Sequence, residues 1–301
     1  MSASFHYPHA LVTTDWLAER AADEDLRIFE CTTYLRAPEP GVEAPYKVES
    51  GRADFEQGHI PGAAFLDLQV ELSDNTSPSH LRFTMPRPEA LASALGRRGV
   101  SEGTRVVLYA RGAAQWATRV WWMMRAIGFD NVAILDGGWE KWTLEGRPRS
   151  TEEATYPPGT LTAKPRSGCF ADKEEVKAAI GDGGSCTINA LSADLHTGET
   201  NRYGRRGRIP GSVNVPAAAL TPSDDKTFVD AATANAVFEA VGADPAKRII
   251  VYCGGGIAAT LTYVLLFGSK DDRDSLERIN TILIATCAVL GTALLSIGAS
   301  T

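Results

Sequence analysis

The chain lacks the features that assign proteins to several common functional classes. It has five cysteines, but no two form a Cys-x-x-Cys pair and none has neighbours typical of a metal site. The net charge is -7 and no basic cluster is interleaved with aromatic residues, so we expect no nucleic-acid partner. The first residues show no basic stretch followed by an apolar core. We therefore expect a cytoplasmic protein with free thiols and with neither a metal nor an organic cofactor.

Two short signals occur twice in the same order. Residues 58–64 read Gly-His-Ile-Pro-Gly-Ala-Ala and recur at 207–213 as Gly-Arg-Ile-Pro-Gly-Ser-Val. The apolar run Arg105–Tyr109 recurs as Arg248–Tyr252, each time after a helical stretch. Self-similarity of this kind indicates repeated structural units, so we predict two copies of one unit.

The repeat divides the chain into segments. We predict a first domain at 10–148, a linker at 149–169, a second domain at 170–268 and a divergent tail at 269–301. The linker is rich in Pro, Gly, Thr and Ser, which is typical of connecting segments.

Short apolar runs and helical stretches alternate along both halves. The runs typical of buried parallel strands lie at 106–109, 132–135 and 249–252. The predicted helices span 88–97, 115–127, 172–180 and 231–241. This alternation favours an α/β fold in which helices cover a parallel sheet.

One cysteine lies where such a sheet places its ligand crevice. Cys253 follows an apolar strand directly and precedes a helix. The loop after it consists of Gly254, Gly255, Gly256, Ile257 and Ala258. Glycines let consecutive N–H groups turn toward the sulfur, and the helix N-terminus adds partial positive charge. Both effects favour the thiolate, so we interpret Cys253 as a nucleophile and the loop as its substrate-binding surroundings.

The first half does not repeat this cysteine. The position that matches Cys253 is Ala110, so the first half is expected to be inactive and to form one wall of a cleft. An alternative interpretation of Cys253 is a buried thiol before an ordinary glycine-rich turn. The order of strand, cysteine, three glycines and helix favours the nucleophile.

The two Ile-Pro-Gly turns, the two strands that end in tyrosine and the sequence Leu-Asp-Gly-Gly-Trp at 135–139 together resemble the rhodanese family in its tandem form. The resemblance covers about residues 10–268. It implies two tandem rhodanese-like domains, each a parallel sheet flanked by helices, with an inactive first domain, a catalytic second one and an atypical C-terminus.

The resemblance also implies a reaction. A tandem sulfurtransferase moves a sulfane sulfur from thiosulfate or 3-mercaptopyruvate to a thiophilic acceptor, cyanide or a thiol, here through a persulfide on Cys253. A cysteine phosphatase or arsenate reductase uses a related loop, but the arginine that closes that loop is replaced by Ala259. A non-enzymatic sulfur carrier, sensor or binding module on a rhodanese fold is the remaining alternative.

The sequence departs from the family where the donor is recognised. Asn189 and Leu191 stand where relatives that use mercaptopyruvate have Asp and Arg. Thiosulfate-preferring relatives have basic residues inside the cysteine loop, where this chain has glycines. Three arginines near the second Ile-Pro-Gly turn are candidates for the missing positive charge: Arg202, Arg205 and Arg206.

The tail departs from the repeat altogether. Residues 279–299 are uncharged and long enough to cross a bilayer as a helix, and basic residues precede them. Three interpretations are left open: a C-terminal membrane anchor, a buried helix that replaces missing elements of the second domain, and an altered gene end.

Overall fold

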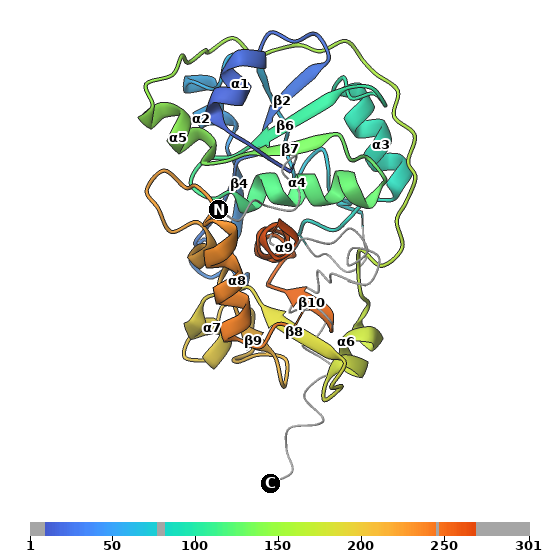
Figure 1. Ribbon diagram of the computed structural model, residues 1–301, viewed down its shortest axis with the longest axis vertical. Helices are drawn as coiled ribbons and strands as arrows, with labels where there is room; N and C mark the ends of the chain where they lie inside the picture. The colour runs from blue at the N-terminus through green and yellow to red at the C-terminus, as the bar shows by residue number, and fades with distance from the viewer. Residues whose placement is uncertain (1–9, 77–81, 245–246, 269–301) are drawn as a thin grey trace.

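The computed structural model describes residues 10–76, 82–244 and 247–268. Two α/β halves lie at opposite ends of the longest axis, and α4 (Gln115–Ala126) and α9 (Ala258–Gly268) lie between their sheets (Figure 1). The predicted fold class, with parallel sheets flanked by helices in both halves, is confirmed.

The first half is built on a five-stranded parallel sheet with the order β1-β7-β6-β2-β5. Its strands are β1 (Leu11–Val12), β2 (Leu26–Glu30), β5 (Ala63–Phe65), β6 (Arg105–Tyr109) and β7 (Val132–Leu135). The other helices of this half are α1 (Thr14–Arg20), α2 (Arg52–Gln57), α3 (Pro88–Arg97) and α5 (Gly138–Leu144). The central strands are apolar and buried because helices cover both faces.

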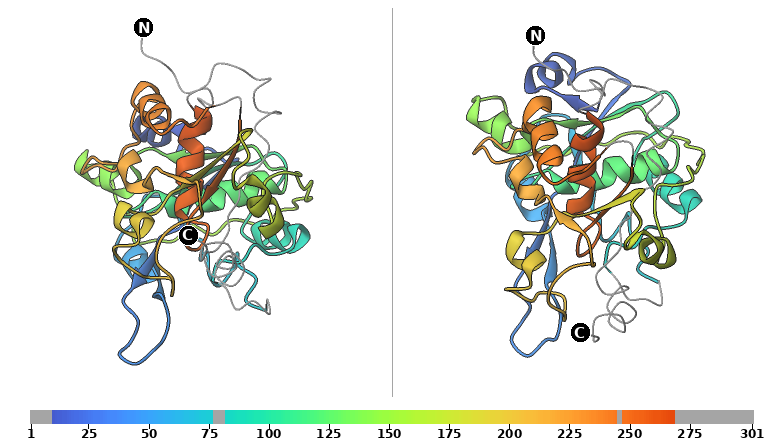
Figure 2. Two further views of the ribbon diagram at one scale, coloured as in Figure 1. Left: turned by 90° about the horizontal axis from the view of Figure 1, so that it is seen from below. Right: turned by 60° about the horizontal axis from the view of Figure 1, so that its bottom comes forward.

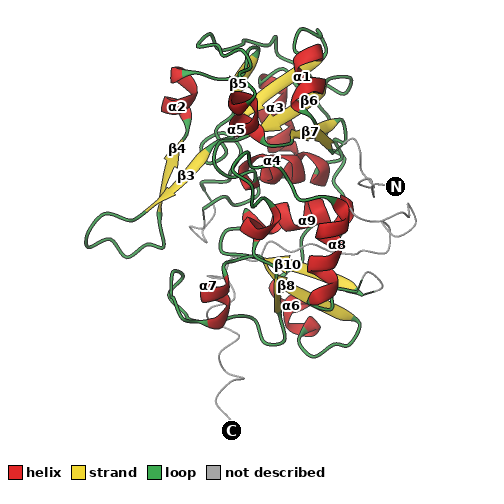
Figure 3. Cartoon of the chain, turned by 60° about the vertical axis from the view of Figure 1, so that its left-hand side comes forward, coloured by secondary structure: helices red, strands yellow, loops and turns green. Residues whose placement is uncertain are grey.

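An antiparallel hairpin projects from this half. It consists of β3 (Thr33–Arg36) and β4 (Lys47–Ser50), and Figure 3 shows that its long loop extends away from the five-stranded sheet. The loop, residues 37–46, ends at Tyr46, which is buried. The hairpin therefore brings first-half residues to the region between the halves.

The second half has a smaller sheet among the described residues, with the order β10-β8-β9. Its strands are β8 (Ser185–Asn189), β9 (Val213–Asn214) and β10 (Arg248–Tyr252). The helices around it are α6 (Lys173–Ala179), α7 (Ala193–Thr197), the short 3-10 helix η1 (Ala217–Leu220), and α8 (Ala231–Ala240). In the described part of the chain β10 is an edge strand, whereas its counterpart β6 lies inside the first sheet.

The same hydrogen bond links the two repeated signals in each half. The hydroxyl of Tyr109, at the end of β6, accepts from the N–H of Ile60 at 3.2 Å. The hydroxyl of Tyr252, at the end of β10, accepts from the N–H of Ile209 at 3.0 Å. Each tyrosine ties an Ile-Pro-Gly turn to the strand that precedes the site loop, so the repeat seen in the sequence is also a repeat of contacts.

Helices α4 and α9 pack against each other and join the halves (Figure 2). The hydroxyls of Thr118 and Thr260 are 2.8 Å apart in the buried contact. Trp122 meets Tyr263 edge to face, with ring centroids 4.5 Å apart. Since aromatic and aliphatic side chains fill this contact, the region between the sheets is a packed core.

The segment between α5 and α6 runs along the first half without regular structure. The hydroxyl of Tyr156 accepts from the N–H of Ile28 at 3.0 Å and donates to the carbonyl of Gly62 at 2.5 Å. Farther on, the N–H of Lys164 donates to the carbonyl of Ile127 at 2.7 Å. The segment predicted as a linker is thus bound to the first half along its length.

The seven elements predicted from the sequence all appear, each within one residue of its expected ends. In the described ranges, no helix combines the length and the apolar character that a bilayer span requires. The predicted apolar segment 279–299 lies outside the described residues.

Candidate active site

Cys253 lies between the end of β10 and the start of α9. Its Sγ accepts a hydrogen bond from the N–H of Gly256 at 3.1 Å. Gly256 has φ of 76°, a conformation that favours glycine, and this turn directs its N–H back toward the sulfur. The helix α9 begins directly after the loop, so its N-terminal partial charge adds to this donor. Of the N–H groups that the sequence predicts to turn toward the sulfur, that of Gly256 does so.

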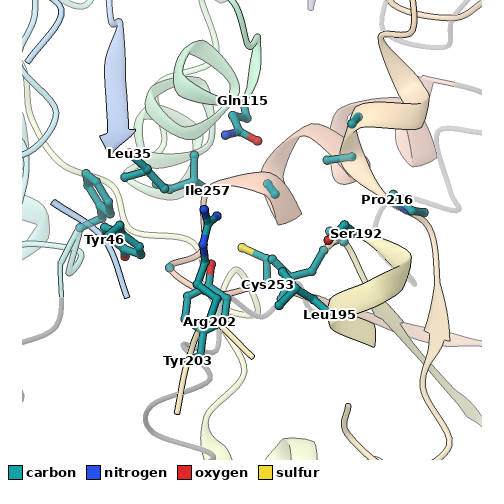
Figure 4. Close-up of a pocket in the computed structure, with 18 residues that line it drawn as sticks. Leu35, Tyr46, Gln115, Ser192, Leu195, Arg202, Tyr203, Pro216, Cys253 and Ile257 are labelled. Atoms are coloured by element: carbon teal, nitrogen blue, oxygen red, sulfur yellow. The ribbon is translucent and has the colours of Figure 1, made fainter. Parts of the chain in front are cut away.

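The sulfur faces a cavity of about 310 Å³ between the halves. Figure 4 shows that Cys253 and Arg202 point into the same space, and that the first half contributes Leu35, Tyr46 and Gln115. Four of the five predicted loop residues line the cavity: Gly254, Gly255, Ile257 and Ala258. Gly256, the fifth, contributes its N–H to the sulfur instead.

The three predicted arginines have different positions. Arg202 lines the cavity and, of the described residues that do so, is the only one with a charged side chain. Arg206 donates to the carbonyls of Gly198 and Glu199, at 3.1 and 2.9 Å, so it holds its own loop. Arg205 is exposed and is not among the lining residues. Of the three candidates for the missing positive charge, Arg202 is the one that lines the cavity.

The two residues that stand in the place of a family Asp and Arg also lie at this site. The side-chain oxygen of Asn189 accepts from the N–H of Leu191 at 2.9 Å, which closes the turn after β8. Leu191 lines the cavity. An apolar side chain thus occupies the wall where the family pattern has an arginine.

Two tyrosines that the sequence analysis missed press against the glycine loop. The ring of Tyr203 occupies the space that a Cβ at Gly254 would need. A Cβ at Gly255 would lie 3.2 Å from the hydroxyl of Tyr46. The two rings meet edge to face, with centroids 6.5 Å apart. A side chain at position 254 would therefore have to displace the Tyr203 ring.

Burial, followed by the nearby sulfur of Cys253, raises the pKa of Tyr46 to about 12. The Tyr46 hydroxyl therefore stays protonated at physiological pH and can donate a hydrogen bond into the cavity. No sequence signal marked this residue, because it ends an irregular hairpin loop and reaches the site only through the packing of the two halves.

The matching loop of the first half is filled by its own side chains. Arg111, directly after Ala110, donates to the buried carboxylate of Glu30 at 2.7 and 3.2 Å. Its guanidinium also lies 4.1 Å from the ring centroid of Trp139. The pocket beside Ala110 is only about 10 Å³. This loop has neither a thiol nor space for a substrate.

The other described cysteines lie elsewhere. Burial raises the pKa values of Cys31, Cys169 and Cys186, which keeps these thiols protonated. Among the described residues, no group of three or more His, Cys, Asp or Glu side chains is arranged to hold a metal ion.

A family model described as "Rhodanese-like domain" matches residues 13–145 and 173–273. The chain belongs to the rhodanese family. The two matched segments correspond to the two halves, and the predicted tandem arrangement of rhodanese-like units is confirmed.

Relatives with named activities match most of the chain. It is 33% identical to a 3-mercaptopyruvate sulfurtransferase of Escherichia coli, over 85% of this chain and 87% of that protein. It is 32% identical to a putative thiosulfate sulfurtransferase, SseB, of Mycobacterium tuberculosis, over 72% and 76%. The crystal structure of SseA from Escherichia coli matches with a TM-score of 0.73 and 29% identity, over 92% and 98%. The prediction of a sulfurtransferase is confirmed.

Proposed function

We propose that the protein takes the thiol sulfur of 3-mercaptopyruvate, or of a close α-keto thiol, carries it as the sulfane sulfur of a persulfide on Cys253, and transfers it to a thiol or cyanide. The observation that supports this most strongly is the position of its sulfur. It receives the Gly256 N–H at 3.1 Å and faces a cavity whose lining includes one charged side chain, Arg202. A single arginine suits a donor with one carboxylate.

The first half-reaction forms the persulfide. The Cys253 thiolate attacks the donor sulfur, and the carbon–sulfur bond of the donor breaks with its electron pair left on carbon. The ketone next to that carbon accepts the charge as an enolate, which takes up a proton to give pyruvate. The sulfur stays on the enzyme, so one difficult transfer becomes two easier ones.

The second half-reaction regenerates the thiolate. An acceptor thiolate or cyanide attacks the outer sulfur of the persulfide, and the sulfur–sulfur bond breaks with its electron pair on Cys253. The N–H of Gly256, 3.1 Å from the inner sulfur, is placed to stabilise the negative charge that returns there. The sulfur itself supplies the chemistry, so the proposal includes no metal or organic cofactor.

The loop argues for 3-mercaptopyruvate over thiosulfate. Thiosulfate is a compact dianion, and cationic side chains close to the sulfur would favour it. Here the loop presents Gly254 and Gly255 instead, and the cavity lining includes Leu35 and Leu191. Because these surroundings are mostly apolar, a small keto acid with one charge is the better match.

The proposal includes the domain boundaries predicted from the sequence. In it, residues 10–148 form an inactive domain, 149–169 a linker and 170–268 the catalytic domain. The partners are small molecules; the net charge of -7 supports the absence of a nucleic-acid partner. A cytoplasmic location fits the free thiols on which the reaction depends.

Steady-state kinetics with two arginine variants tests the proposal. In Arg202→Met, we expect kcat/KM for 3-mercaptopyruvate to fall about tenfold to a hundredfold, because a charge-assisted contact to the carboxylate is lost. Arg205→Met is the matched control and should remain within about twofold of wild type, because an exposed charge outside the cavity contributes little. A wild-type preference for thiosulfate, or equal effects of the two variants, would contradict this donor assignment.

A further inference from the structure

Arg119 is a buried cation from the first half that reaches the cysteine loop of the second. It lies on α4, and only 1% of the residue's surface is exposed. One terminal nitrogen donates to the carbonyl of Phe83 at 2.9 Å, and the other lies 3.4 Å from the carbonyl of Gly256. Its Nε has no hydrogen-bond partner among the described residues. Within the described ranges, no carboxylate forms an ion pair with Arg119.

A buried guanidinium without an anion is unfavourable. Removing a charge from water costs several kcal/mol, and buried arginines are normally paired with a carboxylate. Burial lowers the pKa of Arg119 to about 10, and the sulfur of Cys253 opposes this shift. Since this pKa is well above neutral, Arg119 is charged at physiological pH. The presence of this buried charge beside the cysteine loop therefore requires an explanation.

We infer that Arg119 is the counter-cation of the Cys253 sulfur and the positioning residue of its loop. The inference rests on the proposed function in taking Cys253 as the reacting thiolate. Gly256 connects the two groups: its carbonyl faces Arg119 at 3.4 Å and its N–H donates to the sulfur at 3.1 Å. The active loop thus receives positive charge across the domain contact.

This assignment accounts for a property of the loop. Positions 254 and 255 are glycines, so no side chain of these residues can supply a cation. The space above them is taken by Tyr203 and Tyr46. A cation that approaches from α4, behind the loop, leaves the cavity open to substrate while it favours the thiolate.

Alkylation of Cys253 by iodoacetamide, followed by peptide mass analysis from pH 5 to 10, tests the inference without any sulfur donor. In Arg119→Met, which keeps a long side chain but no charge, we expect the midpoint of the rate–pH profile to rise by about one pH unit. The alkylation rate at pH 7 should then fall about tenfold. Arg119→Lys keeps the charge and should restore most of the rate.

Thr118→Val is the matched control on the same helix. It removes a buried hydroxyl contact between the halves, at 2.8 Å, without changing any charge. We expect its alkylation profile to keep the wild-type midpoint, within about 0.3 pH units. An Arg119→Met profile that also keeps this midpoint in folded protein would overturn the inference, because Arg119 would then hold carbonyls only.

A second measurement compares proteins with and without the Arg119 charge. The melting temperatures of Cys253→Asp and Cys253→Asn are compared from pH 4 to pH 7, each alone and combined with Arg119→Met. Burial at position 253 raises the pKa of the introduced carboxyl and a neighbouring cation lowers it, so the Asp variant gains more stability relative to Asn as pH rises when Arg119 is present. We expect the change in the Asp–Asn difference between pH 4 and pH 7 to favour Asp by about 2 °C or more when Arg119 is present, compared with Arg119→Met. An equal pH dependence in the two backgrounds would overturn the inference.

These results are separable from the proposed function. If the alkylation and melting shifts appear but no persulfide forms with any donor, the electrostatic pair stands and the donor chemistry fails. If persulfide forms at an undiminished rate in Arg119→Met and the alkylation midpoint is unchanged, the sulfurtransferase stands and the pair fails.

Discussion

The two halves share the same arrangement of strand and turn, and they differ in what fills the loop after the strand that ends in tyrosine. Tyr109 and Tyr252 make equivalent hydrogen bonds to their Ile-Pro-Gly turns, at 3.2 and 3.0 Å. Beyond these tyrosines the halves diverge. The loop at Ala110 closes on a pocket of about 10 Å³, whereas the loop at Cys253 faces a cavity of about 310 Å³.

The comparison shows that the repeat places a loop at the strand end, and that side chains decide whether the loop can react. In the first half, Arg111 is turned inward onto Glu30, so the cation that could attract a substrate is neutralised. In the second half the loop has no side chain at Gly254 and Gly255, and residues of both halves line the cavity that it faces. The first half therefore contributes to the site through Tyr46, which lines the cavity, and, in our inference, through Arg119.

The largest expected effect comes from moving the thiol between the halves. Cys253→Ser should lower sulfur transfer at least about a thousandfold, because the covalent intermediate is lost. Adding Ala110→Cys to that variant should restore nothing, because the first-half loop lacks space for a donor. Transfer rates and intact mass after incubation with 3-mercaptopyruvate measure the activity lost in Cys253→Ser and any activity regained in the double variant. A sulfur gained by the double variant would show that the frame alone is sufficient.

The next effect separates stability from chemistry. Arg111→Met leaves the carboxylate of Glu30, which has no exposed surface, without its cation. We expect a loss of about 3–5 kcal/mol in the free energy of unfolding. Chemical denaturation measures this loss, and transfer rates in folded protein should change little.

Arg52→Met is the matched control for that loss. Arg52 pairs with Glu153 at 2.5 Å, but about a third of each side chain is exposed. Its loss should cost about 1 kcal/mol or less, as for other solvated ion pairs. Equal costs for the two arginine variants would contradict the claim that the first-half loop depends on a buried pair.

A smaller effect compares one glycine from each loop. Gly254→Ala places a Cβ on the ring of Tyr203, and we expect overpacking to cost about 1–3 kcal/mol and to slow transfer. Gly112→Ala meets no atom within 4 Å, but its φ of 69° is strained for alanine, so we expect about 1 kcal/mol and no change in transfer. Thermal melts measure the stability of the two variants, and transfer rates measure their activity. Slower transfer in Gly112→Ala alone would contradict the claim that only the second-half loop takes part in the reaction.

The smallest effect concerns the hydroxyl that the first half contributes to the cavity. Tyr46→Phe should reduce kcat/KM about threefold to tenfold, the value of one hydrogen bond. Because burial raises the pKa of Tyr46 to about 12, the hydroxyl stays protonated from pH 6 to 10. The reduction should therefore be the same across that range. A reduction that shrinks toward pH 10 would show that Tyr46 ionises there.

Most of the frame could be predicted because its signals are local. The Ile-Pro-Gly turns, the apolar strands and the cysteine before three glycines each lie within a few consecutive residues. Periodicity placed the helix Pro88–Arg97 and the strand Val132–Leu135 at their observed bounds. Local backbone preference and burial determine such elements, and these two properties can be inferred from a few consecutive residues.

The residues that surround the sulfur could not be predicted in the same way. Tyr46 and Arg119 belong to the first half and reach the loop after Cys253 only because the two halves pack together. No spacing in the sequence encodes that contact. The sequence could not rank the three candidate arginines for a related reason: charge density does not show in which direction a side chain points, and Arg206 turns back onto the carbonyls of its own loop.

The most direct test of the account is to locate the transferred sulfur. Wild type and Cys253→Ser are incubated with 3-mercaptopyruvate, and the mass of the intact protein and of each cysteine-containing peptide is measured. The account predicts a gain of one sulfur atom in wild type only, on the peptide that contains Cys253. A gain on any other cysteine, or an equal gain in Cys253→Ser, would contradict the claim that the second half performs the chemistry.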